Sequence, residues 1–378
     1  MIRIKVTHII NSMGEQLAGG ETYLITLIEH SPGVTHSVVC KKGSGLAGAL
    51  RGRGIETMEV DFSLSDRRRL IRCVEDYCRG QKTTLIHAHG FFSSWLALRA
   101  GSRTGLPVVV TVHNRLEDAV HKRRGLRAAF ELWARRRMAR RLWPRAEAVT
   151  AVSQGVRDSM CRAGIAANAI TVVYNGVDVD QVNQAAVGQL PKGLSSIFES
   201  PIIGTVARLE PFKGLENVLA VAAATRHSEP DLKFVVVGDG SERQGLMRTI
   251  KKQGLADRVK LLGYIDQPAL VVRHFLAYFM SSPHEGINRA ALEAAALGVP
   301  LILSPNRPEA FIDGVSAFIA AASKPEEVAA KIATIRRSPE LVMSVSQGGS
   351  AVVDKTFSAQ AMATAVLNVY RRVLSSGV

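Results

Sequence analysis

The chain has 378 residues, enough for two domains that each bury a substantial core. Its composition, 47% hydrophobic and 21% charged, is that of a globular protein, and no uninterrupted apolar run approaches the roughly 18 residues that suggest a membrane span. The formal net charge is +15, and the four cysteines have neither the spacing of a zinc site nor the density of a disulfide framework, which favours the reducing cytosol.

Short apolar runs that are typical of buried strands alternate with helical stretches along the whole chain. The runs are IKVTHII, HSVVC, TLIHAH, VVVTVH, AVTAV and ITVVY in the first half, then PIIGTVA, KFVVVG, VKLLG, AYFMSS and VPLILS. This alternation predicts parallel sheets with crossover helices. Residues 175 to 200 lose the periodicity and gather Gly, Pro, Ser and Asn, so we expect a linker there. Two doubly wound α/β domains facing a cleft follow, with ligands at the carboxyl ends of the strands.

Glycines and histidines follow or end several strands expected in the first half. Gly19 and Gly20 lie between the first strand and the first helix, where a small-residue turn can meet a phosphate. His113 ends the run VVVTVH, and His87 and His89 lie in TLIHAH. Each histidine is either a cleft residue that hydrogen-bonds or moves protons, or a satisfied core residue. Because no Cys or carboxylate cluster accompanies them at ligand spacing, we expect no metal site.

A strongly basic segment follows at residues 121–145. It holds ten of the 48 lysines and arginines and a single acid, Glu131. Such a run attracts phosphate-rich surfaces such as anionic lipid or nucleic acid, or is a solvated helix face. On a helical wheel Leu126, Phe130 and Trp133 share one side, but arginines return to the same sector one or two turns later. We therefore expect an impure amphipathic helix, for which membrane contact and plain solvation both stay open.

Candidate anion ligands follow the strands of the second half. Arg208 and Lys213 come after PIIGTVA and are spaced to converge on one diphosphate, although two unrelated surface cations are the plainer alternative. After KFVVVG, Gly238 and Gly240 allow the backbone to approach a ligand closely. Arg243 stands where the dinucleotide-binding fingerprint requires a third glycine, so that motif is excluded.

The stretch SPHEGINRAALEAAALGVP, residues 282–300, places Glu285 in a loop and Glu293 in a helix that begins near Asn288. The helix start leaves backbone N–H groups of roughly residues 287–290 without partners and adds the positive end of the helix dipole, which favours a bound phosphate. Glu293 follows about one and a half turns later, within reach of sugar hydroxyls attached to that phosphate. Two solvated glutamates on a plain strand-loop-helix unit are the alternative.

These features follow one another in the order GGE, the histidine of VVTVH, AVS, YNGVD, GTVARLEPFKG, VVVGDGSERQGL, DRVKLLGYI, EGINRAALEAAALGVP and PEAFIDG. In that order they resemble the retaining family-4 glycosyltransferases of the GT-B fold, over nearly the whole chain and most specifically in its second half. The resemblance implies two Rossmann-like domains facing a central cleft. An acceptor domain at 1–190, completed by a C-terminal helix at 356–378, is followed by a nucleotide-sugar domain at 200–355.

The resemblance also implies the role of each candidate residue. In the second half it places Glu285 on the donor sugar, Glu293 on the nucleotide ribose, and Arg208 and Lys213 on the diphosphate leaving group. The remaining donor-binding positions are Ile287, Asn288 and Arg289 at the helix start, Gly238 and Gly240, and Tyr264 near the base. In the first half, Gly19 and Gly20 approach the diphosphate and His113 lies near the donor sugar. Asn288 and Arg289 stand where relatives often carry Gly-Leu, so the phosphate-binding amides are expected to be placed differently, with Arg289 as an added cation.

The expected function is therefore transfer of a hexose or related sugar, with retention, from a nucleotide diphosphate sugar to a glycan or glycolipid acceptor. No metal or other cofactor is expected. The basic segment suggests a lipid-linked acceptor of lipopolysaccharide or exopolysaccharide synthesis and a cytoplasmic enzyme, peripheral on the inner face of the membrane. A sugar-nucleotide epimerase of the same fold and a basic nucleic-acid-binding protein are the alternatives, although scarce aromatics and the absence of a known module speak against nucleic acid as a partner.

Overall fold

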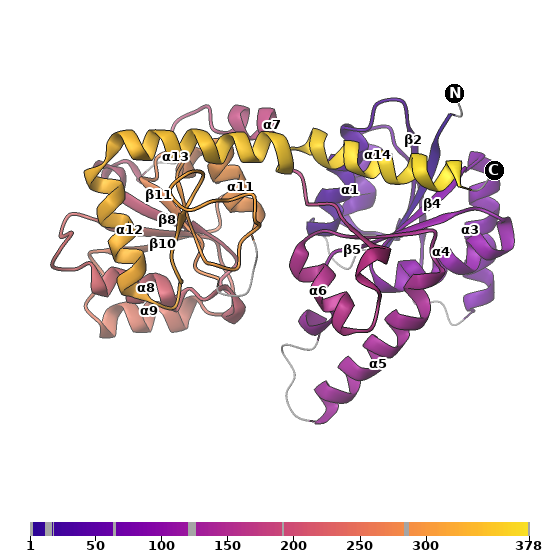
Figure 1. The fold of residues 1–378 in the computed structure, drawn as a ribbon, viewed down its shortest axis with the longest axis horizontal. Coiled ribbons are helices and arrows are strands. Elements are labelled where there is room, and N and C mark those ends of the chain that lie inside the picture. Colours follow the sequence, from indigo (N-terminus) through magenta and orange to yellow (C-terminus); the bar gives the residue numbers. More distant parts are fainter. Residues whose placement is uncertain are drawn as a thin grey trace. The chain divides into compact units, whose positions relative to one another are not determined.

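The computed structural model describes residues 3–11, 17, 19–62, 66–119, 126–190, 193–282 and 287–376. The chain divides into two compact units, of which the first comprises residues 1–176 and 359–378 and the second residues 177–358 (Figure 1). Each unit is built around one parallel sheet. Within the described ranges, no helix combines the length and the apolar character needed to cross a bilayer.

The first unit contains a seven-stranded sheet in the order β3-β2-β1-β4-β5-β6-β7. Its strands are β1 (Lys5–Ile10), β2 (Thr35–Lys41), β3 (Glu56–Val60), β4 (Leu85–His89), β5 (Val108–Val112), β6 (Ala148–Ala151) and β7 (Ile170–Val172). The central strands are buried on both faces, as parallel strands covered by helices require, and every residue of β5 is buried. The strand order reverses between β1 and β4, so the carboxyl ends of these strands form the edge where open α/β sheets bind ligands.

Helices from both ends of the sequence cover this sheet (Figure 1). They are α1 (Gly19–Glu29), α2 (Gly45–Arg51), α3 (Arg67–Gln81), α4 (Phe91–Thr104), α5 (Leu126–Leu142), α6 (Gln154–Arg162) and α14 (Ala359–Ser375), with the 3-10 turns η1 (Leu116–Ala119), η2 (Trp143–Arg145) and η3 (Ala167–Ala169). The C-terminal helix α14 belongs here because Tyr370 is fully buried, with its hydroxyl 2.6 Å from Nδ1 of His87 on β4.

The second unit contains a six-stranded sheet in the order β10-β9-β8-β11-β12-β13. Its strands are β8 (Ile202–Val206), β9 (Lys233–Val237), β10 (Val259–Gly263), β11 (Ala277–Phe279), β12 (Leu301–Leu303) and β13 (Phe318–Ile319). Its helices are α7 (Val179–Ala185), α8 (Glu216–Ala224), α9 (Arg243–Lys252), α10 (Ala269–Val272), α11 (Arg289–Ala296), α12 (Pro325–Arg337) and α13 (Pro339–Val352), with the turns η4 (Ser195–Glu199), η5 (Pro211–Lys213) and η6 (Val353–Phe357). Here the order reverses between β8 and β11.

The sequence pattern predicted all of these strands except β3 and β13. All eleven apolar runs named above form strands, which confirms the doubly wound α/β class. β3 was missed because its sequence, ETMEV, is too polar to read as a buried run, and it lies at an edge of the first sheet. β13 was missed because it has only two residues.

The first unit ends earlier than the resemblance implied, at the start of the linker range expected from composition. The division falls after Gly176 and the chain returns at Ala359, whereas the sequence indicated boundaries near 190 and 356. Part of the expected linker forms α7, because the Asp178 side chain accepts a hydrogen bond from the N–H of Gln181 (2.9 Å) and caps that helix. Arg273 then donates to the carbonyl oxygen of Ala186 (2.6 Å), which fastens this stretch to the second unit.

Candidate functional site

The two predicted cations of the second unit follow β8, at the edge where its strand order reverses. Arg208 is exposed two residues beyond β8, and Lys213 ends the 3-10 turn η5. The Lys213 ammonium lies 5.2 Å from the centre of the Phe212 ring, close enough for a cation-π contact that holds the side chain. Both cations therefore lie at the ligand-binding edge of the sheet, as the sequence predicted.

Two serines clamp this turn to the segment that follows the neighbouring strand β11. Ser281 Oγ donates to the carbonyl oxygen of Lys213 (2.9 Å), and Ser282 Oγ donates to that of Phe212 (3.2 Å). In return, the Asn217 side-chain amide donates to the carbonyl oxygen of Ser281 (3.0 Å). The serines were not singled out from the sequence. They connect the cation-bearing turn with the loop that leads into α11.

The helix α11 begins where the sequence predicted. Asn288 is its N-cap, and Asn288 Oδ1 accepts a hydrogen bond from the N–H of Ala291 (2.8 Å). The buried Tyr278 hydroxyl lies 3.3 Å from the same Oδ1 and 3.0 Å from the carbonyl oxygen of Val206, so one side chain links the end of β8 to the start of α11. The cap uses the N–H of Ala291, and helix geometry leaves the N–H groups before it for a ligand. Ile287 is half-buried just before the cap.

Arg289 and Glu293 form an ion pair on the first turns of α11. Arg289 Nε lies 2.7 Å from Glu293 Oε1, and about a third of the Arg289 side chain is exposed. The spacing of four residues gives the signal for this pair, which was overlooked when Arg289 was considered only as a cation for phosphate. The Glu293 carboxylate therefore has a guanidinium as its direct neighbour. Glu285, the other predicted glutamate, lies outside the described residues.

Gly238 and Gly240 allow the backbone after β9 to pack against the backbone after β8. A Cβ on Gly238 would lie 2.0 Å from the carbonyl oxygen of Ala207, and one on Gly240 would lie 2.5 Å from that of Leu209. Both glycines have positive φ, 131° and 158°. The close approach predicted from the sequence is thus present, but the described partner is protein backbone. It fixes the loop that carries Arg208.

Tyr264 follows β10 with 71% of its surface exposed, and its hydroxyl lies 3.3 Å from Asp266 Oδ1. The preceding carbonyl oxygen, that of Gly263, accepts a hydrogen bond from the N–H of Gly238 (2.8 Å). The ring of Tyr264 is thus available to a base, while one lone pair of the Gly263 carbonyl is already used. The base-reading role remains a prediction.

The predicted residues of the first unit meet at the carboxyl edge of its sheet. His113 directly follows β5 and is half-buried, and Gly20, in the first turn of α1, lies against its ring. A Cβ on Gly20 would lie 3.6 Å from the His113 ring, an ordinary contact, so the ring alone does not require glycine there. Gly19 is exposed, and a Cβ at this position would meet none of the described residues within 4 Å, which leaves space for a ligand.

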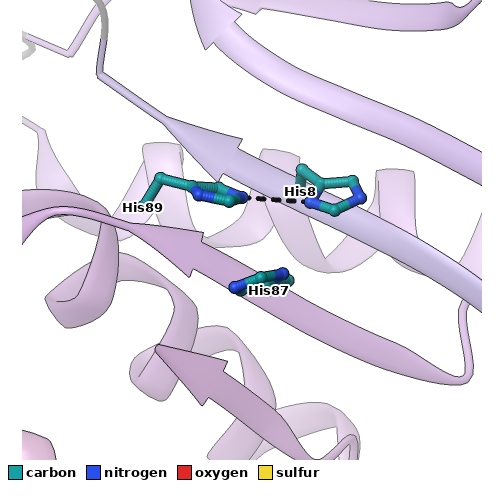
Figure 2. A group of neighbouring side chains, drawn as sticks. All are labelled: His8, His87 and His89. Carbon is teal, nitrogen blue, oxygen red and sulfur yellow. Dashed lines mark hydrogen bonds between the residues drawn. The ribbon is translucent and has the colours of Figure 1, made fainter. Parts of the chain in front are cut away.

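The structure decides the open question about the other histidines, because His87 and His89 are fully buried core residues. It also adds His8 on β1, which the sequence did not single out. The ligand atoms of His8, His87 and His89 lie within 4.8 Å of one another (Figure 2), a grouping of three imidazoles that the sequence analysis, which looked for a Cys or carboxylate cluster, did not consider. The missed signal is that β1 and β4 are neighbours at the reversal of strand order, which brings residues far apart in sequence together.

Burial keeps this group of histidines neutral near pH 7. Burial lowers the pKa of His87 to about 3, and those of His36 and His113 to about 4. For His8 and His89, burial and then the neighbouring imidazoles hold the pKa well below its usual value. Neutral imidazoles can both donate and accept hydrogen bonds.

Two glycosyltransferase family models match most of this chain. The family described as Glycosyltransferase Family 4 matches residues 17–181, and Glycosyl transferases group 1 matches residues 192–351. A D-inositol 3-phosphate glycosyltransferase of Segniliparus rotundus is 27% identical over 368 residues, which cover 92% of this chain and 78% of that protein. The O-antigen biosynthesis glycosyltransferase WclY of Escherichia coli is 26% identical over 204 residues, which cover 53% of this chain and 55% of WclY.

Among solved structures, HepE of Anabaena in complex with UDP has a TM-score of 0.80 at 19% identity, covering 98% of this chain and 100% of HepE. This likeness shows that the two units have the GT-B fold. The comparisons give no support to the epimerase or the nucleic-acid alternative.

Proposed function

The chain belongs to the family-4 glycosyltransferases and is an enzyme that uses a nucleotide sugar, and from this premise we propose that it transfers a hexose with retention to a membrane-bound glycan acceptor. In this proposal residues 177–358 bind the nucleoside diphosphate sugar and residues 1–176 bind the acceptor. The bond from the anomeric carbon to the diphosphate breaks, the acceptor hydroxyl bonds to the same face, and its proton leaves with the diphosphate.

The proposed donor site rests on the hydrogen bonds that join the turn bearing Lys213 to the segment leading into α11. Ser281 and Ser282 hold the turn, and Tyr278 holds the helix start, so cations and helix amides share one sheet edge. Negative charge grows on the departing diphosphate in the transition state, and preorganised cations stabilise it there. We propose that Arg208 and Lys213 supply this charge in place of a divalent metal. Donor cleavage should therefore proceed undiminished in EDTA.

The donor chemistry can be tested without knowing the acceptor. Glycosyltransferases hydrolyse their donor slowly when water takes the acceptor's place, so UDP-glucose, UDP-galactose and UDP-N-acetylglucosamine serve as probes; HepE, solved with UDP, motivates the uridine base. Proton NMR of the freed sugar, recorded before it mutarotates, reports the anomeric configuration. Retention predicts the anomer of the donor as the first product. The opposite anomer would contradict the proposed stereochemistry, and no cleavage of any nucleotide sugar would contradict the donor site.

The helix α5 supports an acceptor at a membrane. Leu126, Phe130 and Trp133 recur at helical spacing and are 89%, 68% and 56% exposed. The rings of Phe130 and Trp133 stack at 5.7 Å, and the Arg137 guanidinium lies 5.7 Å from the Trp133 ring centre. An exposed apolar stripe flanked by arginines suits the surface of an anionic leaflet. WclY, an O-antigen enzyme, motivates a lipid-linked glycan as the acceptor.

Sedimentation with vesicles tests this surface. The enzyme should pellet with vesicles containing phosphatidylglycerol at low salt, stay in solution with phosphatidylcholine alone, and be released at high salt. Phe130→Ser with Trp133→Ser should reduce membrane affinity by at least about a hundredfold, since burying two aromatic rings contributes several kcal/mol. The matched control, Met247→Ser with Met343→Ser, removes two exposed apolar side chains of the second unit and should pellet normally. An equal loss of pelleting in both double variants would contradict the assignment of the membrane-binding surface to α5.

A further inference from the structure

A line of imidazoles crosses one face of the first sheet and ends at His113. His36 Nδ1 lies 2.9 Å from His8 Nε2, and His8 Nδ1 lies 3.1 Å from His89 Nε2, the contact drawn in Figure 2. His89 Nδ1 lies 3.2 Å from His113 Nε2. Each contact joins the Nδ1 of one ring to the Nε2 of the next, so the four rings form a single chain with a direction.

The chain allows two arrangements of its protons. A neutral imidazole has one N–H and one bare nitrogen, so each ring donates once and accepts once. If every proton is on Nδ1, each ring donates toward His113; if every proton is on Nε2, each ring donates toward His36. The tautomer of His113 is therefore coupled to that of the ring farthest from it.

The far end of the chain distinguishes the two arrangements. His36 is 9% exposed, and among the described residues its Nε2 is buried with no hydrogen-bond partner. With protons on Nε2, this atom would be an orphaned N–H group; with protons on Nδ1, it is only a bare acceptor. Orphaned buried N–H groups are rarer than under-satisfied acceptors, which favours protons on Nδ1.

We propose that His36, His8 and His89 are positioning residues that hold His113 in the tautomer with its proton on Nδ1, so that His113 meets substrate as a hydrogen-bond donor. This rests on the proposed function, in which the edge carrying His113 faces substrate. The ring plane is also held, since Tyr23 packs edge-on against His113 with ring centres 5.0 Å apart and Gly20 covers the ring. A donor at this place binds a hydroxyl or phosphate oxygen and repels a cation.

A metal ion at His8, His87 and His89 is the competing use of the same rings. It would break the contact between His8 and His89. It would also take one nitrogen of His87, whose Nδ1 lies 2.6 Å from the Tyr370 hydroxyl and whose Nε2 lies 2.7 Å from Thr111 Oγ1. No carboxylate is in the group to offset the charge of a buried cation. Hydrogen bonding therefore accounts for these rings better than ligation does.

Nitrogen NMR of the full-length protein labelled with [15N]histidine tests the inference directly, because protonated and bare ring nitrogens resonate far apart. At pH 7.5, His113, identified by its absence in His113→Gln, should show a proton on Nδ1 and a bare Nε2. The spectrum should be the same in EDTA and with one equivalent of Zn²⁺. A proton on Nε2 of His113, or Zn²⁺-induced shifts of His8 and His89, would overturn the proposal.

Three variants distinguish a positioning role of His89 from a purely structural role. His89→Asn keeps an N–H near the position that faces His113, and His89→Leu has nearly the same shape without it. We expect the Leu variant to mix the tautomers of His113 and to slow donor cleavage about tenfold with little change in UDP affinity, and the Asn variant to restore both. His87→Leu, equally buried but outside the chain, should leave the His113 tautomer unchanged.

Equal effects of His89→Asn and His89→Leu, or a shifted His113 tautomer in His87→Leu, would contradict the proposal. Nucleotide binding is measured separately, so the proposal about the histidines can be contradicted while the transferase assignment stands. The NMR result of the unaltered protein holds even if a variant does not fold.

Discussion

Mild acid should destabilise the first unit, because burial holds a group of its histidines in the neutral form. In the unfolded chain each imidazole has a pKa near 6.5, whereas in the folded protein His36 and His113 have pKa values of about 4 and His87 of about 3. The folded state therefore binds fewer protons than the unfolded state between pH 6.5 and 4. The stability that neutral burial allows is complete above pH 6.5 and is lost as the pH falls below it.

The size of the loss follows from these pKa values. At pH 5.5, one unit below the unfolded pKa, each of the three groups costs about 1 kcal/mol, so together they lower the free energy of unfolding by about 3 kcal/mol relative to pH 7.5. His8 and His89 act in the same direction. The flanking Tyr23 and Tyr370 stay neutral because burial raises their pKa values. Since domains are stable by only about 5–15 kcal/mol, the effect is large.

Urea unfolding at pH 7.5, 6.5 and 5.5 measures this loss. Tryptophan fluorescence reports on the first unit alone, because the three tryptophans, Trp95, Trp133 and Trp143, all lie in it. His36→Gln should remove about 1 kcal/mol of the pH dependence. Equal stability at pH 7.5 and 5.5, or the same pH dependence in His36→Gln as in the unaltered protein, would refute the reasoning.

Two further predictions concern the second unit. Lys213→Ala and Glu293→Ala should each lower transfer at least about tenfold, or about 1.4 kcal/mol of transition-state stabilisation, and near-normal turnover of both would overturn the donor site. Gly204→Ala should destabilise the unit by about 1–3 kcal/mol or more in thermal unfolding, because its Cβ would lie 1.9 Å from the buried Phe275 ring. Gly80→Ala, whose new methyl group would meet no described residue within 4 Å, should be neutral or stabilising, and an equal loss there would contradict the packing argument.

The sequence could predict the parts of the site that follow from local rules. The apolar runs predicted eleven strands, and the position of Arg208 and Lys213 at a strand end follows from where loops occur in a parallel sheet. The helix start at Asn288 follows from cap chemistry, and the structure confirms it with a hydrogen bond from Ala291 N–H. These features depend on residues that are close together in the sequence.

What the sequence could not predict depends on neighbours brought together by the strand order. Ser281 meets Lys213 only because β11 lies beside β8, and His8 meets His89 only because β1 lies beside β4. Gly238 was expected to approach a ligand, but its steric requirement comes from the Ala207 carbonyl on the adjacent strand end. The polar strand β3 was missed because edge strands need no continuous apolar run.

Calorimetric titration of the purified protein with UDP, GDP, ADP and dTDP at moderate salt tests the central claim most directly. A nucleotide-sugar transferase should bind one of the four selectively at micromolar strength, about 8 kcal/mol, and Lys213→Ala should weaken that binding. If none of the nucleotides binds while the protein is folded, the donor site drawn on β8 and α11 is wrong.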